Sequence, residues 1–190
     1  MLLYHTGFDE IPMPDLRRGR VNADFGQGFY LSDDPAFSER WATEKKDSKT
    51  YINRYELATD GLRIKRFERD EDWFRYIFSN RRRAPDTLRD FDVIIGPIAN
   101  DTLFNTFGIL TSGMLDDAVA MQLLRLGPAY MQVVLKTERA KAALCFLGAK
   151  VLGHDVLEAN KTRLAAEEAA FQALFSETLQ RLLGDTEGEI

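Results

Sequence analysis

The stretch Asp24-Phe25-Gly26-Gln27-Gly28-Phe29-Tyr30-Leu31 carries the strongest indication of the fold, because glycine alternates in it with aromatic residues. Glycine at these positions permits a positive φ, or a close approach of the backbone to a ligand. The Asp33-Asp34-Pro35 sequence that follows predicts the start of a helix, with an acidic cap before a proline in the first turn. We therefore expect a glycine-aromatic turn that contains Tyr30.

Outward from this turn, the hydrophobic pattern predicts a mixture of strands and helices. Strands are expected at 2–4, 50–57, 91–98 and 131–135, and helices from 33, at 71–80 and at 115–126, with a turn or short helix at 140–146. The strands come in irregular order and do not alternate with helices as a doubly wound fold requires. The fold class expected is therefore α+β.

A long helix is predicted from Asp155 to Leu183, with Leu157, Leu164, Phe171 and Phe175 near one stripe. Burial of such side chains is too favourable for the stripe to stay in water, so we expect it to pack against the domain. A homodimer through this helix is the weaker alternative. The predicted organisation is one domain over 1–150 and a helical extension over 151–190.

Composition excludes several classes of function. Hydrophobic residues make up 45% of the 190 residues and charged residues 29%, which is typical of a globular chain. The net charge of -5 argues against broad binding to duplex DNA, and the one basic run, Arg81-Arg82-Arg83, is interpreted as a solvated loop end. No apolar run reaches the roughly 20 residues of a membrane span, so no membrane partner is expected.

Cysteine and histidine are scarce. The single Cys145 lies in an apolar run, which favours a buried, unreactive thiol. One cysteine and no leader-like segment indicate the cytoplasm. Two histidines, His5 and His154, offer no zinc-ligand spacing, so no metal is expected. A P-loop, a complete Rossmann glycine pattern and a Gly-x-Ser-x-Gly elbow are all absent.

Three residues remain as candidates for chemistry: His5 at the end of the first strand, Tyr30 in the glycine-aromatic turn, and Gln132 in a late strand. Each has an ordinary structural explanation when taken alone. Because each lies where a strand ends or turns, we predict that the three converge on one cleft, with Tyr30 and Gln132 on the same side of the sheet.

Together with their surroundings, these residues resemble the DUF3990 family, a bacterial family placed in the ADP-ribosyltransferase-like superfamily. The resemblance covers about 1–146. The matching segments are Leu3-Tyr4-His5 with Gly7, Ile11-Pro12 with Pro14-Asp15, Gly19-Arg20, Asp24 to Ser32, Trp41-Ala42, Tyr55-Glu56-Leu57, Trp73 with Asn80-Arg81, Phe91 to Asp101, and Gln132-Val133-Val134 with Thr137-Glu138 and Ala140.

The resemblance implies a split β-sheet with flanking helices, and a His-Tyr-Gln set that binds NAD as a substrate. His5 is then expected to bind the adenosine-side ribose, Tyr30 to stack on nicotinamide, and Gln132 to contact the nicotinamide ribose. Further NAD contacts are expected from residues near these three, namely Thr6, Gly7, Arg18 or Arg20, Gly28 and Phe29. The sequence departs from the family pattern in His5-Thr6-Gly7, where His-Gly-Ser/Thr is usual, and in glutamine at 132.

The activity that the resemblance implies is ADP-ribosyl transfer from NAD to a macromolecule of unspecified type. The expected setting is a bacterial toxin or effector in the cytoplasm, with an antitoxin as a partner. Two alternatives stay open at this point: an NAD glycohydrolase, and a degenerate member that binds a nucleotide or a partner without turnover. The neutral amide of Gln132 favours the last of these, because it offers no negative charge to a developing cation.

Overall fold

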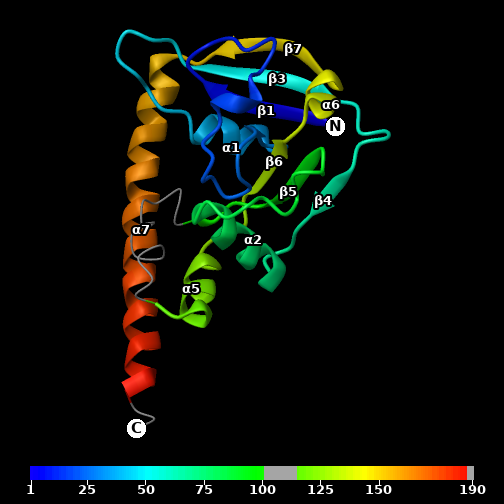
Figure 1. Ribbon diagram of the computed structural model, residues 1–190. Helices are drawn as coiled ribbons and strands as arrows, with labels where there is room; N and C mark the ends of the chain where they lie inside the picture. The colour runs from blue at the N-terminus through cyan, green and yellow to red at the C-terminus, as the bar shows by residue number, and fades with distance from the viewer. Residues whose placement is uncertain (101–114, 188–190) are drawn as a thin grey trace.

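The computed structural model describes residues 1–100 and 115–187, and it has a mixed α+β fold with two sheets and a long C-terminal helix (Figure 1). The first sheet is antiparallel, in the order β1 (Leu2–Gly7), β3 (Tyr51–Leu57), β7 (Leu144–Val151). The second has the order β2 (Phe29–Leu31), β6 (Met131–Leu135), β5 (Val93–Pro97), β4 (Ile64–Arg66). The predicted α+β class is confirmed.

A backbone bridge joins the two sheets where Tyr4 of β1 pairs with Ser32, directly after the end of β2. The Tyr4 amide donates to the Ser32 carbonyl at 2.8 Å, and the Ser32 amide donates back to the Tyr4 carbonyl at 2.9 Å. The amide and carbonyl of each residue are thereby satisfied, and the strands diverge on either side. This junction brings the end of β1 beside the glycine-aromatic turn.

Apolar side chains from both sheets form a core between them. The first sheet contributes Leu3, Tyr55 and Leu57, and the second contributes Leu31, Val93, Ile95, Val133 and Leu135. The opposite face of the second sheet carries Ile94 and Val134, which pack against helices. This inside-outside alternation follows from the two-residue period of a strand.

Four short helices begin where the sequence offers a capping side chain. These are α1 (Pro35–Arg40), α2 (Glu71–Arg81), α5 (Asp117–Leu124) and α6 (Glu138–Ala142). Their caps are Asp34, Asp70, Asp116 and Thr137, each accepting a backbone N–H of the first turn. The 3-10 helix η1 (Leu16–Arg18) begins in the same way at Asp15. Asp34 and Asp116 thus have structural roles as helix caps.

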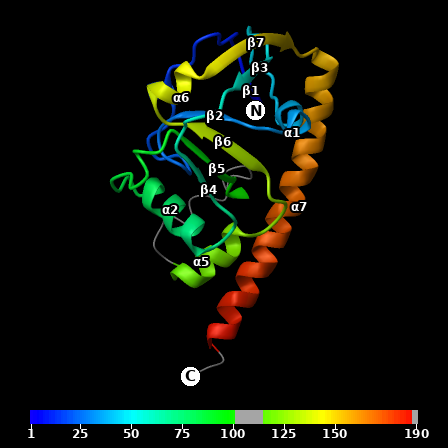
Figure 2. The same cartoon turned by 90° about the vertical axis from the view of Figure 1, so that its right-hand side faces the viewer.

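The long helix α7 (His154–Glu187) runs along the side of the molecule, past both sheets (Figures 1 and 2). Near its start, Leu157 packs with Ala42 and Ile52 beside the first sheet. About four turns further along the helix, Phe171 and Phe175 enter the helical core that covers the second sheet. The predicted packing of the stripe against the domain is confirmed for these side chains, while Leu164 is half-buried. Dimerisation stays a prediction.

Two expectations about single residues were wrong. Cys145 is exposed, because β7 is an edge strand and residue 145 lies opposite the exposed Glu56 on the outward face. Arg81 is buried and ion-paired, so the arginine run is not a solvated loop end throughout. Strand β4 was not foreseen, because it is three residues long with two charged members.

Within 1–100 and 115–187, no helix combines the length and the apolar character that crossing a bilayer requires.

Candidate functional site

A pocket of about 390 Å³ opens at the junction of the two sheets. Its wall includes His5 and Thr6 of β1, Tyr30 of β2 and Gln132 of β6, so residues far apart in sequence are brought together as the sequence predicted. The exposed Arg20 also lines it. The other lining residues are Tyr4, Ala23, Asp24, Leu31, Ser32, Phe37, Ser38, Trp41 and Ile98.

Tyr30 and Gln132 lie on the same side of the second sheet. Tyr30 pairs with Val134 in the register between β2 and β6, and Gln132 is two residues from Val134 along β6. Residues two apart on a strand share a face, so the condition that the site hypothesis set is met.

Gly7, Gly28 and Phe29 lie outside the pocket lining. A Cβ at Gly28 would approach the Leu135 carbonyl oxygen to 2.5 Å, so this glycine permits close packing of the chain on β6. Phe29 is buried, with its ring centroid 4.6 Å from that of His5. The structure thus shows Gly28 packed on β6 and Phe29 packed on His5, and their role in NAD binding stays a prediction.

The Tyr30 hydroxyl is committed to the glycine turn. It donates to the Gly26 carbonyl at 2.7 Å and accepts from the Phe25 amide at 3.0 Å, and Gly26 has the positive φ of 72° that the turn demands. Burial, with the nearby Asp24 carboxylate as a second cause, raises the pKa of Tyr30 far above its ordinary value. The hydroxyl thus stays protonated and serves structure, which leaves the ring as the functional part.

The His5 ring has a defined tautomer. Its Nδ1 lies 2.7 Å from the Tyr30 carbonyl oxygen, and because a carbonyl only accepts, Nδ1 carries the hydrogen. Burial lowers the pKa of His5, although the hydrogen bond to Tyr30 acts in the opposite direction. The imidazole is therefore neutral at pH 7, and Nε2 offers a lone pair as a hydrogen-bond acceptor.

The Gln132 amide also has one defined orientation. Its side chain is buried, and one end lies 3.5 Å from an Asp24 carboxylate oxygen and 3.4 Å from the Pro97 carbonyl oxygen. Both neighbours are acceptors, so the amide nitrogen must face them, although the bonds are long. The amide oxygen is left as the group that Gln132 can offer to a ligand.

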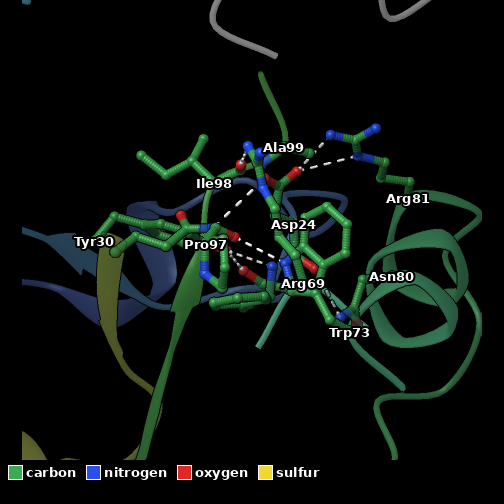
Figure 3. A network of polar contacts seen from close by, with 12 residues as sticks. Asp24, Tyr30, Arg69, Trp73, Asn80, Arg81, Pro97, Ile98 and Ala99 are labelled. Atoms are coloured by element: carbon green, nitrogen blue, oxygen red, sulfur yellow. Dashed lines mark hydrogen bonds and ion pairs between the residues drawn. The ribbon is translucent and has the colours of Figure 1, made fainter. Parts of the chain in front are cut away.

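Sequence reasoning missed two members of the site, Asp24 and Arg81. The Asp24 carboxylate lines the pocket and forms a buried ion pair with Arg81 at 2.8 Å (Figure 3). The signal for Asp24 was its place at the head of the glycine-aromatic block. Arg81 could be singled out only as the last residue on the buried face of α2. The two arginines that follow it in the sequence hid this position.

Aromatic side chains make up much of the remaining pocket wall. Tyr4, Phe37 and Trp41 join Tyr30 in the lining, and Phe37 stacks on Tyr130 with ring centroids 4.6 Å apart. Aromatic faces attract flat rings and cations. A ligand that carries a planar cationic ring and hydroxyl groups fits both the wall and the two acceptors.

A second group of polar side chains lies away from the pocket. Glu44, His154 and Glu158 have possible ligand atoms within 4.8 Å of one another. The His154 and Glu44 side chains are 73% and 49% exposed, and a hydrogen bond of 3.1 Å between Nδ1 and Oε1 joins them, so the contact is explained without a metal.

Lowering the pH from 7.5 to 5.5 is expected to destabilise the protein, in part through His5. The unfolded chain binds a proton near pH 6.5, whereas the pKa of the buried ring is lower, so stability falls as the pH drops through this window. His5→Asn keeps a donor toward the Tyr30 carbonyl and removes the titration. Urea unfolding at both pH values should show a smaller loss in this variant than in the wild type. The exposed His154→Asn is the control, and equal losses in the wild type and His5→Asn would contradict the assignment.

Comparison with known proteins identifies a family and nothing beyond it. The model of a family described as a protein of unknown function (DUF3990) matches residues 1–146. No curated protein and no solved structure matches the chain.

Proposed function

The chain belongs to the DUF3990 family, and we propose that it is an ADP-ribosyltransferase that consumes NAD, with an ADP-ribosyltransferase-like split sheet. The observation that carries the proposal is the polarity of the pocket. His5 and Gln132 both line one pocket with an aromatic wall, and each carries a neutral acceptor atom, Nε2 of His5 and the amide oxygen of Gln132. Neutral acceptors bind hydroxyl donors, which a ribose supplies.

The parts of NAD correspond to different parts of the pocket. The nicotinamide ring is a planar cation that suits the face of Tyr30, and its ribose hydroxyls suit Gln132. The second ribose suits His5, and the exposed cation Arg20 suits the pyrophosphate. In this reading Thr6 and Gly7, at the end of β1, lie next to the nicotinamide end.

The proposed cleavage of NAD needs little acid or base catalysis. Nicotinamide leaves as a neutral molecule when its glycosidic bond breaks, and the ribose passes through an oxocarbenium-like state. Such a reaction depends on orientation and on a shaped site with little water. A protonated Tyr30 and a neutral His5, neither acting as a base, agree with this demand.

The proposed acceptor is a cellular macromolecule, and the proposed setting is a bacterial toxin or effector of the cytoplasm with an antitoxin partner. These parts rest on the family resemblance alone. Incubation of the protein with labelled NAD in a cell extract distinguishes the activities. A labelled macromolecule supports transfer, free ADP-ribose alone indicates a glycohydrolase, and neither product indicates a binding module.

Variants of Tyr30 and Gln132 are expected to fail in different ways. Tyr30→Ala should weaken NAD binding about tenfold or more, because it removes the stacking face, whereas Tyr30→Phe should bind nearly as the wild type does. Gln132→Ala should lower the rate of nicotinamide release ~100-fold or more, with a smaller change in affinity, since its contact strengthens as the ribose distorts.

Calorimetry with NAD and a kinetic assay of nicotinamide release measure the two effects. Met13→Ala changes a side chain that is 81% exposed. This variant is the control for effects of purification and of folding that do not involve the pocket. If Tyr30→Ala binds NAD as tightly as the wild type, the stacking role is wrong. If Gln132→Ala releases nicotinamide at the wild-type rate, the transferase assignment of this residue is wrong.

A further inference from the structure

We propose that Asp24 holds the negative charge of this pocket and acts as a positioning residue, fixing which end of the Gln132 amide faces the ligand. This inference rests on the proposed function only for its effect on turnover. The charge at Asp24 is a property of the protein without a ligand, so it can be tested independently of the proposed function.

Both oxygens of the Asp24 carboxylate are held. Oδ1 accepts from Arg81, at 2.8 Å from Nη2 and 3.1 Å from Nε, and Oδ2 accepts from the Ala99 amide at 3.0 Å (Figure 3). The same Oδ2 accepts from the Gln132 amide nitrogen at 3.5 Å. A carboxylate gripped by a two-pronged guanidinium and a backbone amide has little rotational freedom. It is therefore a fixed reference for Gln132.

The end of α2 supplies this grip through two consecutive residues. Asn80 donates to the Asp24 carbonyl oxygen at 3.1 Å, while Arg81 binds the Asp24 side chain. Asn80 is 3% exposed and Arg81 is 6% exposed. One helix end thus holds both the backbone and the carboxylate of Asp24, at the head of the turn that carries Tyr30.

This arrangement explains why glutamine suits position 132. A carboxylate there would place a second negative charge beside Asp24 Oδ2 and the Pro97 carbonyl oxygen, with no donor to either. An amide instead donates toward both, which leaves its oxygen as the acceptor that Gln132 can offer. The acceptor is then at 132 and the charge at 24, and the pocket selects ligands that carry hydroxyl or N–H donors.

The first test measures the charge at Asp24 without any ligand. Gln132→Glu introduces a carboxyl group whose titration carbon-13 NMR can follow, after selective labelling of glutamate. We expect its pKa to lie a unit or more above the ordinary value of about 4.3, because Asp24 repels the ionised form. In Asp24→Asn/Gln132→Glu the pKa should fall back by most of that amount.

An equal pKa with and without Asp24 would overturn the proposal. Since Asp24→Asn removes a carboxylate that Arg81 binds and so alters the field of the guanidinium, the comparison is repeated in Asp24→Asn/Arg81→Met/Gln132→Glu, which removes both charges of the pair. Near-ultraviolet circular dichroism at pH 7 establishes that each variant is folded before it is titrated.

The second test measures turnover. Asp24→Asn should lower kcat for nicotinamide release at least tenfold while changing the NAD dissociation constant less than threefold, as expected for loss of orientation without loss of the stacking face. Unchanged kcat in a folded Asp24→Asn variant would overturn the positioning role. If the wild type does not cleave NAD at all, the proposed function fails, and the titration above still decides whether Asp24 sets the charge at position 132.

Discussion

Replacing Arg81 with leucine is expected to lower the free energy of unfolding by about 3–5 kcal/mol, because it removes the guanidinium that pairs with the buried Asp24 carboxylate. The Arg81 and Asp24 side chains are 1% and 5% exposed, so solvent does not screen the pair or replace the lost partner. The backbone amide of Ala99 remains as a donor to Asp24, which limits the loss. Urea unfolding followed by circular dichroism measures the change.

The adjacent Arg82 provides a matched control. Its guanidinium lies 3.8 Å from the ring centroid of Phe78, on a helix end that Arg81 also occupies. Arg82→Leu removes a charge of the same kind at an exposed position, with an expected loss of about 1 kcal/mol or less. Removing both charges in Asp24→Leu/Arg81→Leu should cost less than Arg81→Leu alone. Similar losses in Arg81→Leu and Arg82→Leu would contradict the buried pair.

Replacing Phe175 with alanine is expected to destabilise the protein by about 3–5 kcal/mol, the usual range for removing a buried phenylalanine side chain. Phe175 is 3% exposed and packs with Phe171, whose ring centroid is 6.1 Å away. The cavity opens inside the helical core of the second sheet, so the loss is not confined to α7. Chemical denaturation of the full chain gives the value.

Leu174 is the control for Phe175, because it is the neighbour on the same helix and is 41% exposed. Leu174→Ala should change stability by about 0.5 kcal/mol at most, since alanine also favours a helix. If α7 instead mediates dimer formation through its outer face, Leu174→Ala will lower the association constant measured by sedimentation. Equal stability of Phe175→Ala and the wild type would contradict the packing of α7 on the domain.

The sequence predicted those elements whose local signals agree with their environment. Strand β6 was placed at its observed bounds, because Val133, Val134 and Leu135 form an apolar run there that is buried on both faces. Helix α2 was recognised because Trp73, Phe74 and Ile77 share one face. Strand β4 was missed, since its pairing with β5 comes from the backbone and two of its three side chains are charged. Cys145 was misjudged because composition does not reveal which strand is at the edge of a sheet.

Site residues could be predicted from the sequence only where the type of side chain alone indicates a chemical role. His5, Tyr30 and Gln132 could be named, because a histidine, a turn aromatic and a strand amide have distinctive side chains. Tyr30 is held by nearby residues of its own turn, but the orientations of His5 and Gln132 depend on partners far away in sequence: the Tyr30 carbonyl for His5, and Asp24 for Gln132. Asp24 and Arg81 could not be paired from sequence, because 57 positions separate them and no local pattern connects the two.

The course of α7 past both sheets has a mechanical consequence for the pocket. Leu157 is anchored beside the first sheet and Phe171 with Phe175 beside the second, on one continuous helix. A change in the angle between the sheets would therefore require α7 to bend or one of these contacts to break, in addition to disrupting the core that the sheets share and the bridge between Tyr4 and Ser32. We expect this double support to limit the ordering that ligand binding requires.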